Sequence, residues 1–67
     1  MNLFIDHNYR ITKICDEKKD RFANMGLIKD TRVQVKHIQW LNGPIVIEVN
    51  GRLIALRRDE IGCLNLQ

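Results

Sequence analysis

The chain has 67 residues, of which 45% are hydrophobic and 28% are charged, and its formal net charge at pH 7 is +3. A chain this short buries only about 60% of the surface that its unfolded form exposes, so we expect a single domain, residues 1–67, with one small core. It has no apolar run of about 18 residues and no signal-peptide pattern at its start, so we expect a cytoplasmic protein without membrane insertion. The positive charge permits an acidic partner, whether nucleic acid, an anionic membrane surface or a protein face.

The first part of the chain predicts a strand followed by a helix. Apolar and polar residues alternate from Tyr9 to Cys15, which favours a half-buried strand. Asp16 then stands where a helix N-cap is expected, and we predict a helix of about ten residues that ends before Gly26. Glycine accepts the positive φ of the residue that follows a helix, and Leu27 is then expected to pack back on Phe22. The helix has few apolar residues and needs a sheet beneath it.

The second predicted strand changes the side on which its apolar residues fall. Val33 and Val35 point one way, whereas Ile38 and Trp40 have the opposite parity. We therefore expect a bend or bulge near residues 36–37, as in a strand that turns the corner of a barrel. Trp40 is one of four aromatic residues, and we favour a core or rim position for it over a platform that stacks nucleotides.

The Asn50-Gly51 hairpin is the clearest structural signal in the sequence. This dipeptide between apolar runs is typical of a type I′ turn, whose two-residue loop fixes the register with Val49 opposite Arg52. The face expected in the core carries Ile45, Ile47, Ile54 and Leu56. The opposite face carries Pro44, Val46, Glu48, Leu53, Ala55 and Arg57. Because this second face is also largely apolar, we expect it to be partly covered. The Phe22–Met25 face of the helix is the expected cover, with a partner protein as the alternative.

A helical turn over residues 58–62 and a last strand over residues 63–66 complete the order β-α-β-β-β-β. The expected fold class is therefore mainly β, a small curved barrel of about five strands with one short α-helix after the first strand. We predict that the chain is not an enzyme. Acidic pairs such as Asp59 and Glu60 suit helix starts, and the glycines stand alone rather than in a phosphate-binding loop.

Two cysteines and two histidines are the only candidates for a soft metal site. Cys15, Cys63, His7 and His37 do not have the spacing of a structural zinc site, so we predict no metal and no cofactor. Two cysteines are also too few for a disulfide scaffold, and we expect reduced thiols. Pairing of the first and last strands could bring the thiols together, but two small buried apolar side chains are the favoured interpretation.

The one compact basic cluster is Arg57-Arg58, with Arg52 upstream. It suits a solvated strand end that resists edge-to-edge aggregation, and it suits equally well a contact for an anion or an acidic partner. Both interpretations stay open at the level of sequence.

Several motifs follow one another in a recognisable order. They are Met25-Gly26-Leu27 after the helix, Val33-Gln34-Val35, Gly43-Pro44-Ile45-Val46-Ile47, and Leu53-Ile54-Ala55-Leu56-Arg57-Arg58-Asp59-Glu60-Ile61. In this order and spacing the sequence resembles the FeoA proteins of bacterial ferrous-iron uptake, which are small domains with an SH3-like barrel fold. Two departures from the family pattern are Lys29-Asp30, where Pro-Gly is usual, and the absence of Asp before Pro44.

The resemblance implies an SH3-like barrel and a cytoplasmic accessory protein that interacts with the cytosolic GTP-binding region of the membrane transporter FeoB and supports Fe²⁺ import. It implies neither an iron site nor nucleic-acid binding in this chain. The residues expected at the partner contact are Met25, Leu27, Pro44, Arg57 and Arg58.

Two other functions stay open. One is a small nucleic-acid-binding barrel, which the pI near 9.2 would suit, and the other is the SH3-like module of an iron-dependent repressor. We rank the first lower because the basic residues are scattered among acidic ones. We rank the second lower because the first strand begins only a few residues after Met1, where a repressor module would follow a DNA-binding domain.

Overall fold

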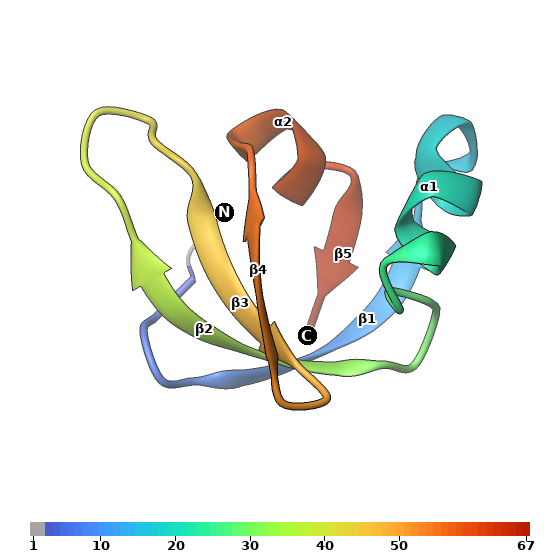
Figure 1. The fold of residues 1–67 in the computed structure, drawn as a ribbon. Helices are drawn as coiled ribbons and strands as arrows, with labels where there is room; N and C mark the ends of the chain where they lie inside the picture. The colour runs from blue at the N-terminus through green and yellow to red at the C-terminus, as the bar shows by residue number, and fades with distance from the viewer. Residues whose placement is uncertain (1–2) are drawn as a thin grey trace.

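The computed structural model describes residues 3–67 and contains one antiparallel sheet of five strands, in the order β4-β3-β2-β1-β5, which curls around a core (Figure 1). The strands are β1 (Asn8–Ile14), β2 (Arg32–Ile38), β3 (Ile45–Val49), β4 (Arg52–Leu56) and β5 (Leu64–Leu66). The helical segments are the 3₁₀ turn η1 (Asp16–Lys18), α1 (Lys19–Asn24) and α2 (Arg58–Ile61). This confirms the mainly β, SH3-like barrel with a short helix after the first strand. In the described part of the chain no helix is long and apolar enough to cross a membrane.

The helical segment after β1 differs from the prediction at its start and agrees with it at its end. It consists of η1 followed by the six-residue α1, and Cys15 rather than Asp16 occupies the N-cap position. At the other end Gly26 has a φ of +83°, and the Leu27 N–H donates to the Phe22 carbonyl at 2.9 Å. Phe22 and Leu27 are both fully buried, which confirms that Leu27 packs back on Phe22 after a glycine has ended the helix.

The β3–β4 hairpin has the predicted register, from Val49 opposite Arg52 next to the turn to Ile45 opposite Leu56 at the far end. Both residues of the Asn50-Gly51 turn have positive φ, +51° and +79°, as a type I′ turn requires. The pairing of β2 with β3 shifts between Val35 and His37. The bend expected near residues 36–37 is therefore confirmed, and it lets the sheet curl.

A single apolar core fills the inside of the curled sheet. Its buried members within the described residues are Ile11, Ile14, Phe22, Leu27, Val33, Val35, Ile45, Ile47, Val49, Leu56, Ile61 and Leu64. They come from all five strands, both α-helices and the turn after α1. On the core face of the hairpin, Ile45, Ile47 and Leu56 are buried and Ile54 is half-buried, as predicted.

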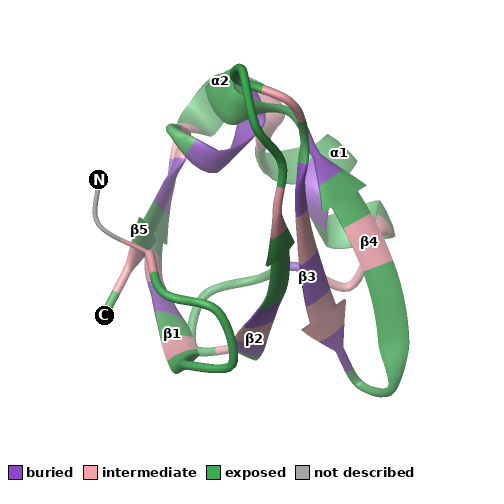
Figure 2. Ribbon diagram, turned by 90° about the vertical axis from the view of Figure 1, so that its left-hand side faces the viewer, coloured by how far each residue is buried: buried purple, intermediate pink, exposed green. Residues whose placement is uncertain are grey.

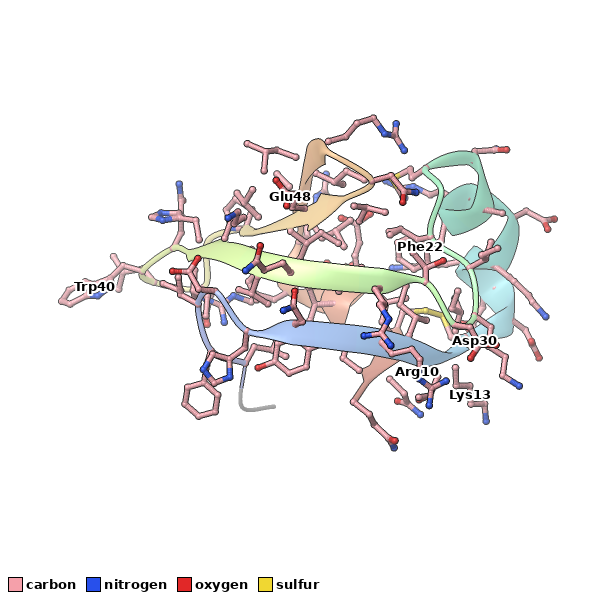
Figure 3. All side chains as sticks on the ribbon, turned by 90° about the horizontal axis from the view of Figure 1, so that it is seen from below. Arg10, Lys13, Phe22, Asp30, Trp40 and Glu48 are labelled. Carbon is pink, nitrogen blue, oxygen red and sulfur yellow. A yellow bond between two sulfur atoms is a disulfide. The ribbon has the colours of Figure 1, made fainter. Side chains whose placement is uncertain are left out.

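Two expectations about surface and core were wrong. Phe22 of α1 points into the core, so the helix does not cover the outer face of β3 and β4, where Leu53 is 66% exposed. Trp40 is 88% exposed and projects from one end of the molecule (Figure 3), so it is neither a core nor a rim residue. It belongs to the loop between β2 and β3, whose conformation no periodic pattern in the sequence specifies.

The prediction of two reduced, buried thiols was also wrong. Cys15 and Cys63 are joined by a disulfide with 5.2 Å between their Cα atoms, and both residues are half-buried. The cause is the pairing of the two terminal strands. Ile14, the last residue of β1, pairs with Leu64, the first residue of β5, so the cysteines just beyond that pair face each other.

Candidate partner-binding surface

The outer face of the β3–β4 hairpin is an apolar surface that the fold leaves exposed. It consists of Val46 and Glu48 on β3 and Leu53 and Ala55 on β4, and we call it the outer hairpin face. Leu53 and Ala55 are exposed, while Val46 and Glu48 are half-buried. The side chains alternate along each strand, so the register that buries the inner residues necessarily turns these four outward. Figure 2 shows exposure along most of β4.

β4 is also an edge strand. Within residues 3–67, β3 is its only neighbour in the sheet. A two-residue hairpin places the residues next to the turn in a hydrogen-bonded pair, so alternate residues, Leu53 and Ala55, direct their backbone N–H and C=O groups away from β3. Such an edge is a template on which a second extended chain can pair. The outer hairpin face is therefore a largely apolar surface that lies beside an open strand edge.

The three arginines of the basic cluster have different environments. Arg52 Nη2 donates to the Met25 carbonyl at 2.8 Å and so links β4 to the end of α1. Arg58 donates through Nε to the Gly43 carbonyl and through Nη2 to a second carbonyl of the same loop, at 2.9 Å each. The Arg57 backbone N–H donates to a carboxylate oxygen of α2, but its exposed guanidinium makes no hydrogen bond or ion pair with residues 3–67. Arg57 is therefore the member of the cluster that is available to a partner.

The loop between β2 and β3 carries two large exposed side chains at its tip. Trp40 is 88% exposed and Leu41 is 91% exposed, and Leu41 has a positive φ of +55°. The two hydrogen bonds from Arg58 hold the ends of this loop together, so the apolar tip is supported. Sequence reasoning missed this tip because nothing in a loop sequence distinguishes an apolar residue that folds inward from one that points outward.

The residues predicted at the partner contact do not form one patch. Pro44, Arg57 and Arg58 lie at the end of the hairpin near the β2–β3 loop, and all three are exposed. Met25 is half-buried and lies beside Arg52, at the other end of β4. A five-residue strand is about 16 Å long, so Met25 is about that far from Arg57. Leu27 is fully buried in the core, so its side chain supports the turn from within and is not accessible to a partner.

A second surface feature is a groove of about 480 Å³ between β1, α1 and the turn that follows it. It is lined by Thr12, Lys13, Ile14, Asp16, Lys19, Asp20, Ala23, Leu27, Ile28 and Lys29. Three lysines and two aspartates give it little net charge, and Ile28 at its rim is 55% exposed. The groove is a second candidate for a contact surface, and the folded arrangement of α1 against β1 creates it.

The charges on the surface are interleaved rather than gathered in a basic stripe. Ion pairs join Arg10 to Asp30, Lys18 to Asp59, Arg21 to Glu60 and Lys36 to Asp6. The hydrogen bond from Lys18 holds the pKa of the Asp59 carboxyl below its ordinary value. This arrangement weakens the nucleic-acid alternative, because phosphate contacts depend on unpaired cations that lie along one face. The described residues also contain no group of three or more His, Cys, Asp or Glu side chains that could hold a metal ion.

The fold and the exposed edge define a small SH3-like barrel with a surface suited to protein contact. The comparison with protein families then identifies the group: the family model of the FeoA domain matches residues 2–66, and the chain belongs to the FeoA-domain family. No curated protein sequence is significantly similar to the chain.

Three solved structures show the same architecture. The iron(II) transport protein A of Clostridium thermocellum superposes with a TM-score of 0.88 at 22% identity, over 98% of this chain and 42% of that chain. The FeoA protein of Chlorobium tepidum has a TM-score of 0.85 at 22% identity, over 98% and 65% of the two chains. A Pseudomonas aeruginosa protein has a TM-score of 0.76 at 31% identity, over 96% and 91%. The chain thus spans less than half of the Clostridium protein and about two thirds of the Chlorobium protein.

Proposed function

We propose that the chain acts in ferrous-iron uptake as a cytoplasmic accessory protein that binds the cytosolic GTP-binding region of a FeoB-type transporter. Membership of the FeoA-domain family supports this role, as does the similarity to a structure described as an iron(II) transport protein. Iron is the cargo of the transporter in this proposal. The chain contributes a protein contact and no catalytic step of its own.

The contact that we propose is the outer hairpin face together with the edge of β4. The observation that carries this choice is Leu53, which is 66% exposed on an edge strand although leucine is an apolar residue. Arg57 adds an unpaired cation at one end of the same strand. An extended, partly acidic segment of the partner would pair with the strand edge, bury Leu53 and face Arg57. Pro44, Arg58 and Met25 then lie at the two ends of the contact.

Binding to the isolated GTP-binding region tests the proposal. We expect Arg57→Glu to weaken binding at least about tenfold, because the substitution places like charges in contact with an acidic segment. Arg32→Glu is the matched control: Arg32 is exposed on β2, away from the hairpin edge, and the change of net charge is the same. Circular dichroism establishes that both variants are folded.

The outcomes separate a specific contact from a general charge effect. Loss of binding in the Arg57 variant alone supports the contact. Equal loss in both variants would show that binding depends on net charge and not on this surface. If both variants bind as well as the unmodified chain, the proposed surface is wrong. If the unmodified chain does not bind, the proposed partner is wrong. GTP hydrolysis measured in the same titration shows whether binding changes turnover.

A further inference from the structure

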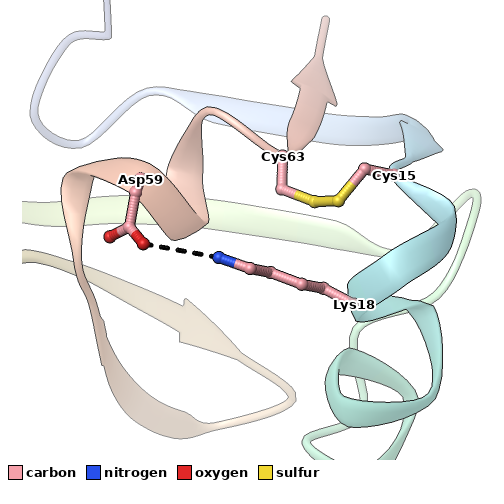
Figure 4. Close-up of a disulfide and its surroundings, with 4 residues drawn as sticks. All are labelled: Cys15, Lys18, Asp59 and Cys63. Carbon is pink, nitrogen blue, oxygen red and sulfur yellow. Dashed lines mark hydrogen bonds and ion pairs between the residues drawn. A yellow bond between two sulfur atoms is a disulfide. The ribbon is translucent and has the colours of Figure 1, made fainter.

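Several independent contacts join the segment that follows β1 to the segment around α2. The disulfide connects Cys15 to Cys63, which are 48 positions apart. The Cys15 N–H also donates to the Cys63 carbonyl at 3.0 Å. Beside them, Lys18 Nζ lies 3.4 Å from Asp59 Oδ2 and joins η1 to α2 (Figure 4). The disulfide therefore lies on a junction between two short helical elements.

The geometry of this junction fits both the disulfide and the dithiol. The Cα atoms of Cys15 and Cys63 are 5.2 Å apart, which is within the range of facing residues on antiparallel strands and also within the range of disulfides. The spacing is thus set by the pairing of β1 with β5 and does not require a sulfur–sulfur bond. Both residues are half-buried and neither is a fully buried member of the core.

We propose that Cys15 and Cys63 form a reversible thiol–disulfide exchange site for a low-molecular-weight thiol such as glutathione, and that its redox state controls how firmly η1 and α1 dock on α2. In the reducing direction, a glutathione thiolate attacks one protein sulfur and the other cysteine leaves as a thiolate that takes up a proton. A second glutathione thiolate attacks the glutathione sulfur of the mixed disulfide and releases the first cysteine. Two electrons and two protons pass to the protein, and glutathione disulfide is formed.

The docking of η1 and α1 on α2 is sensitive to this bond because few other contacts join these segments, although Arg52 also links the end of α1 to β4. Phe22 anchors α1 in the core. The side-chain links from η1 and α1 to α2 are two ion pairs, Lys18 with Asp59 and Arg21 with Glu60, the second at 3.1 Å. Lys18 is half-buried and Asp59 is exposed, so this ion pair contributes little. Arg21 is exposed but Glu60 is buried, so the second ion pair is the stronger link of the two. Reduction is therefore expected to loosen residues 16–24, while the ladder of β1 to β4 stays intact. This inference does not depend on the proposed partner.

The test equilibrates the full chain in buffers of varied glutathione to glutathione-disulfide ratio and counts free thiols by alkylation and mass spectrometry. Hydrogen exchange is then measured on the fully oxidised and fully reduced forms. We expect reversible conversion within the ratios that glutathione buffers can reach, and amide exchange in residues 16–24 that is faster by about tenfold on reduction. The double variant Cys15→Ser with Cys63→Ser is expected to exchange like the reduced form.

Each other outcome overturns the proposal. A chain that stays fully reduced at every ratio has no disulfide to exchange, and one that stays oxidised has a purely structural bond. Conversion without a local change in exchange would remove the link to α1. Global unfolding on reduction would show that the bond holds the whole barrel. If the double variant fails to fold, the reduced form of the unmodified chain supplies the same measurement.

Discussion

The strongest prediction concerns Leu53→Ala. Leu53 is 66% exposed in the free chain. Full burial of a leucine side chain contributes about 1.5–3 kcal/mol, so burial of the exposed two thirds in a complex contributes about 1–2 kcal/mol. Removal of the side chain is then expected to raise the Kd for the FeoB-type GTP-binding region by about 5- to 30-fold. The remaining third limits the loss of folding stability to about 0.5–1 kcal/mol.

Isothermal titration calorimetry with the GTP-binding region measures this change, and chemical denaturation measures the stability. Ile28→Ala is the matched control, because Ile28 is 55% exposed in the groove between β1 and α1. We expect this variant to bind like the unmodified chain. A raised Kd for Ile28→Ala with an unchanged Kd for Leu53→Ala would refute the reasoning and assign the contact to the groove.

Three further predictions concern the fold. Gly26→Ala is expected to lower the free energy of unfolding by about 1–2 kcal/mol, because φ is +83° and a Cβ would lie 3.0 Å from an arginine nitrogen. Gly51→Ala has similar φ and open space, so denaturation should show a smaller loss, from backbone conformation alone. The lowered pKa of Asp59 stabilises the fold above its ordinary pKa of about 3.9, and this contribution is lost as pH falls through the lowered value. In an NMR titration, Lys18→Met is expected to raise the Asp59 pKa toward normal, and an unchanged pKa would contradict the assigned cause. Asp30 has a φ of +74°, so the free energy of unfolding of Asp30→Gly is expected to exceed that of Asp30→Ala by about 1 kcal/mol, and chemical denaturation measures both. Equal free energies would show that the positive φ at this position has no cost.

The parts of the fold that the sequence predicted are those with short-range causes. The Asn50-Gly51 turn admits one common hairpin geometry, so the whole register of β3 and β4 followed from two residues. Gly26 and Leu27 ended the helix as expected, because the capping pattern is local. Even the Lys29-Asp30 departure from the family pattern has a local explanation: Asp30 adopts the positive φ for which glycine is the usual residue.

The features that the sequence did not predict depend on long-range arrangement. The disulfide needs β1 to pair with β5, and no local pattern reports the order of strands. The burial of Leu27 removed it from the predicted contact, because the turn after α1 folds inward. Trp40 became exposed because the β2–β3 loop extends beyond the sheet. For the candidate surface, the sequence defined the outer hairpin face but could not decide whether α1 would cover it.

The contact surface is best decided by NMR mapping of the ¹⁵N-labelled chain during titration with the GTP-binding region of a FeoB-type transporter. We predict amide shift changes in residues 44–48 and 52–57, which contain the outer hairpin face, the edge of β4 and Arg57. Changes confined to residues 12–14 and 27–29, which line the groove beside α1, would contradict the proposed surface. A spectrum that does not change at a saturating concentration of the GTP-binding region would contradict the proposed function itself.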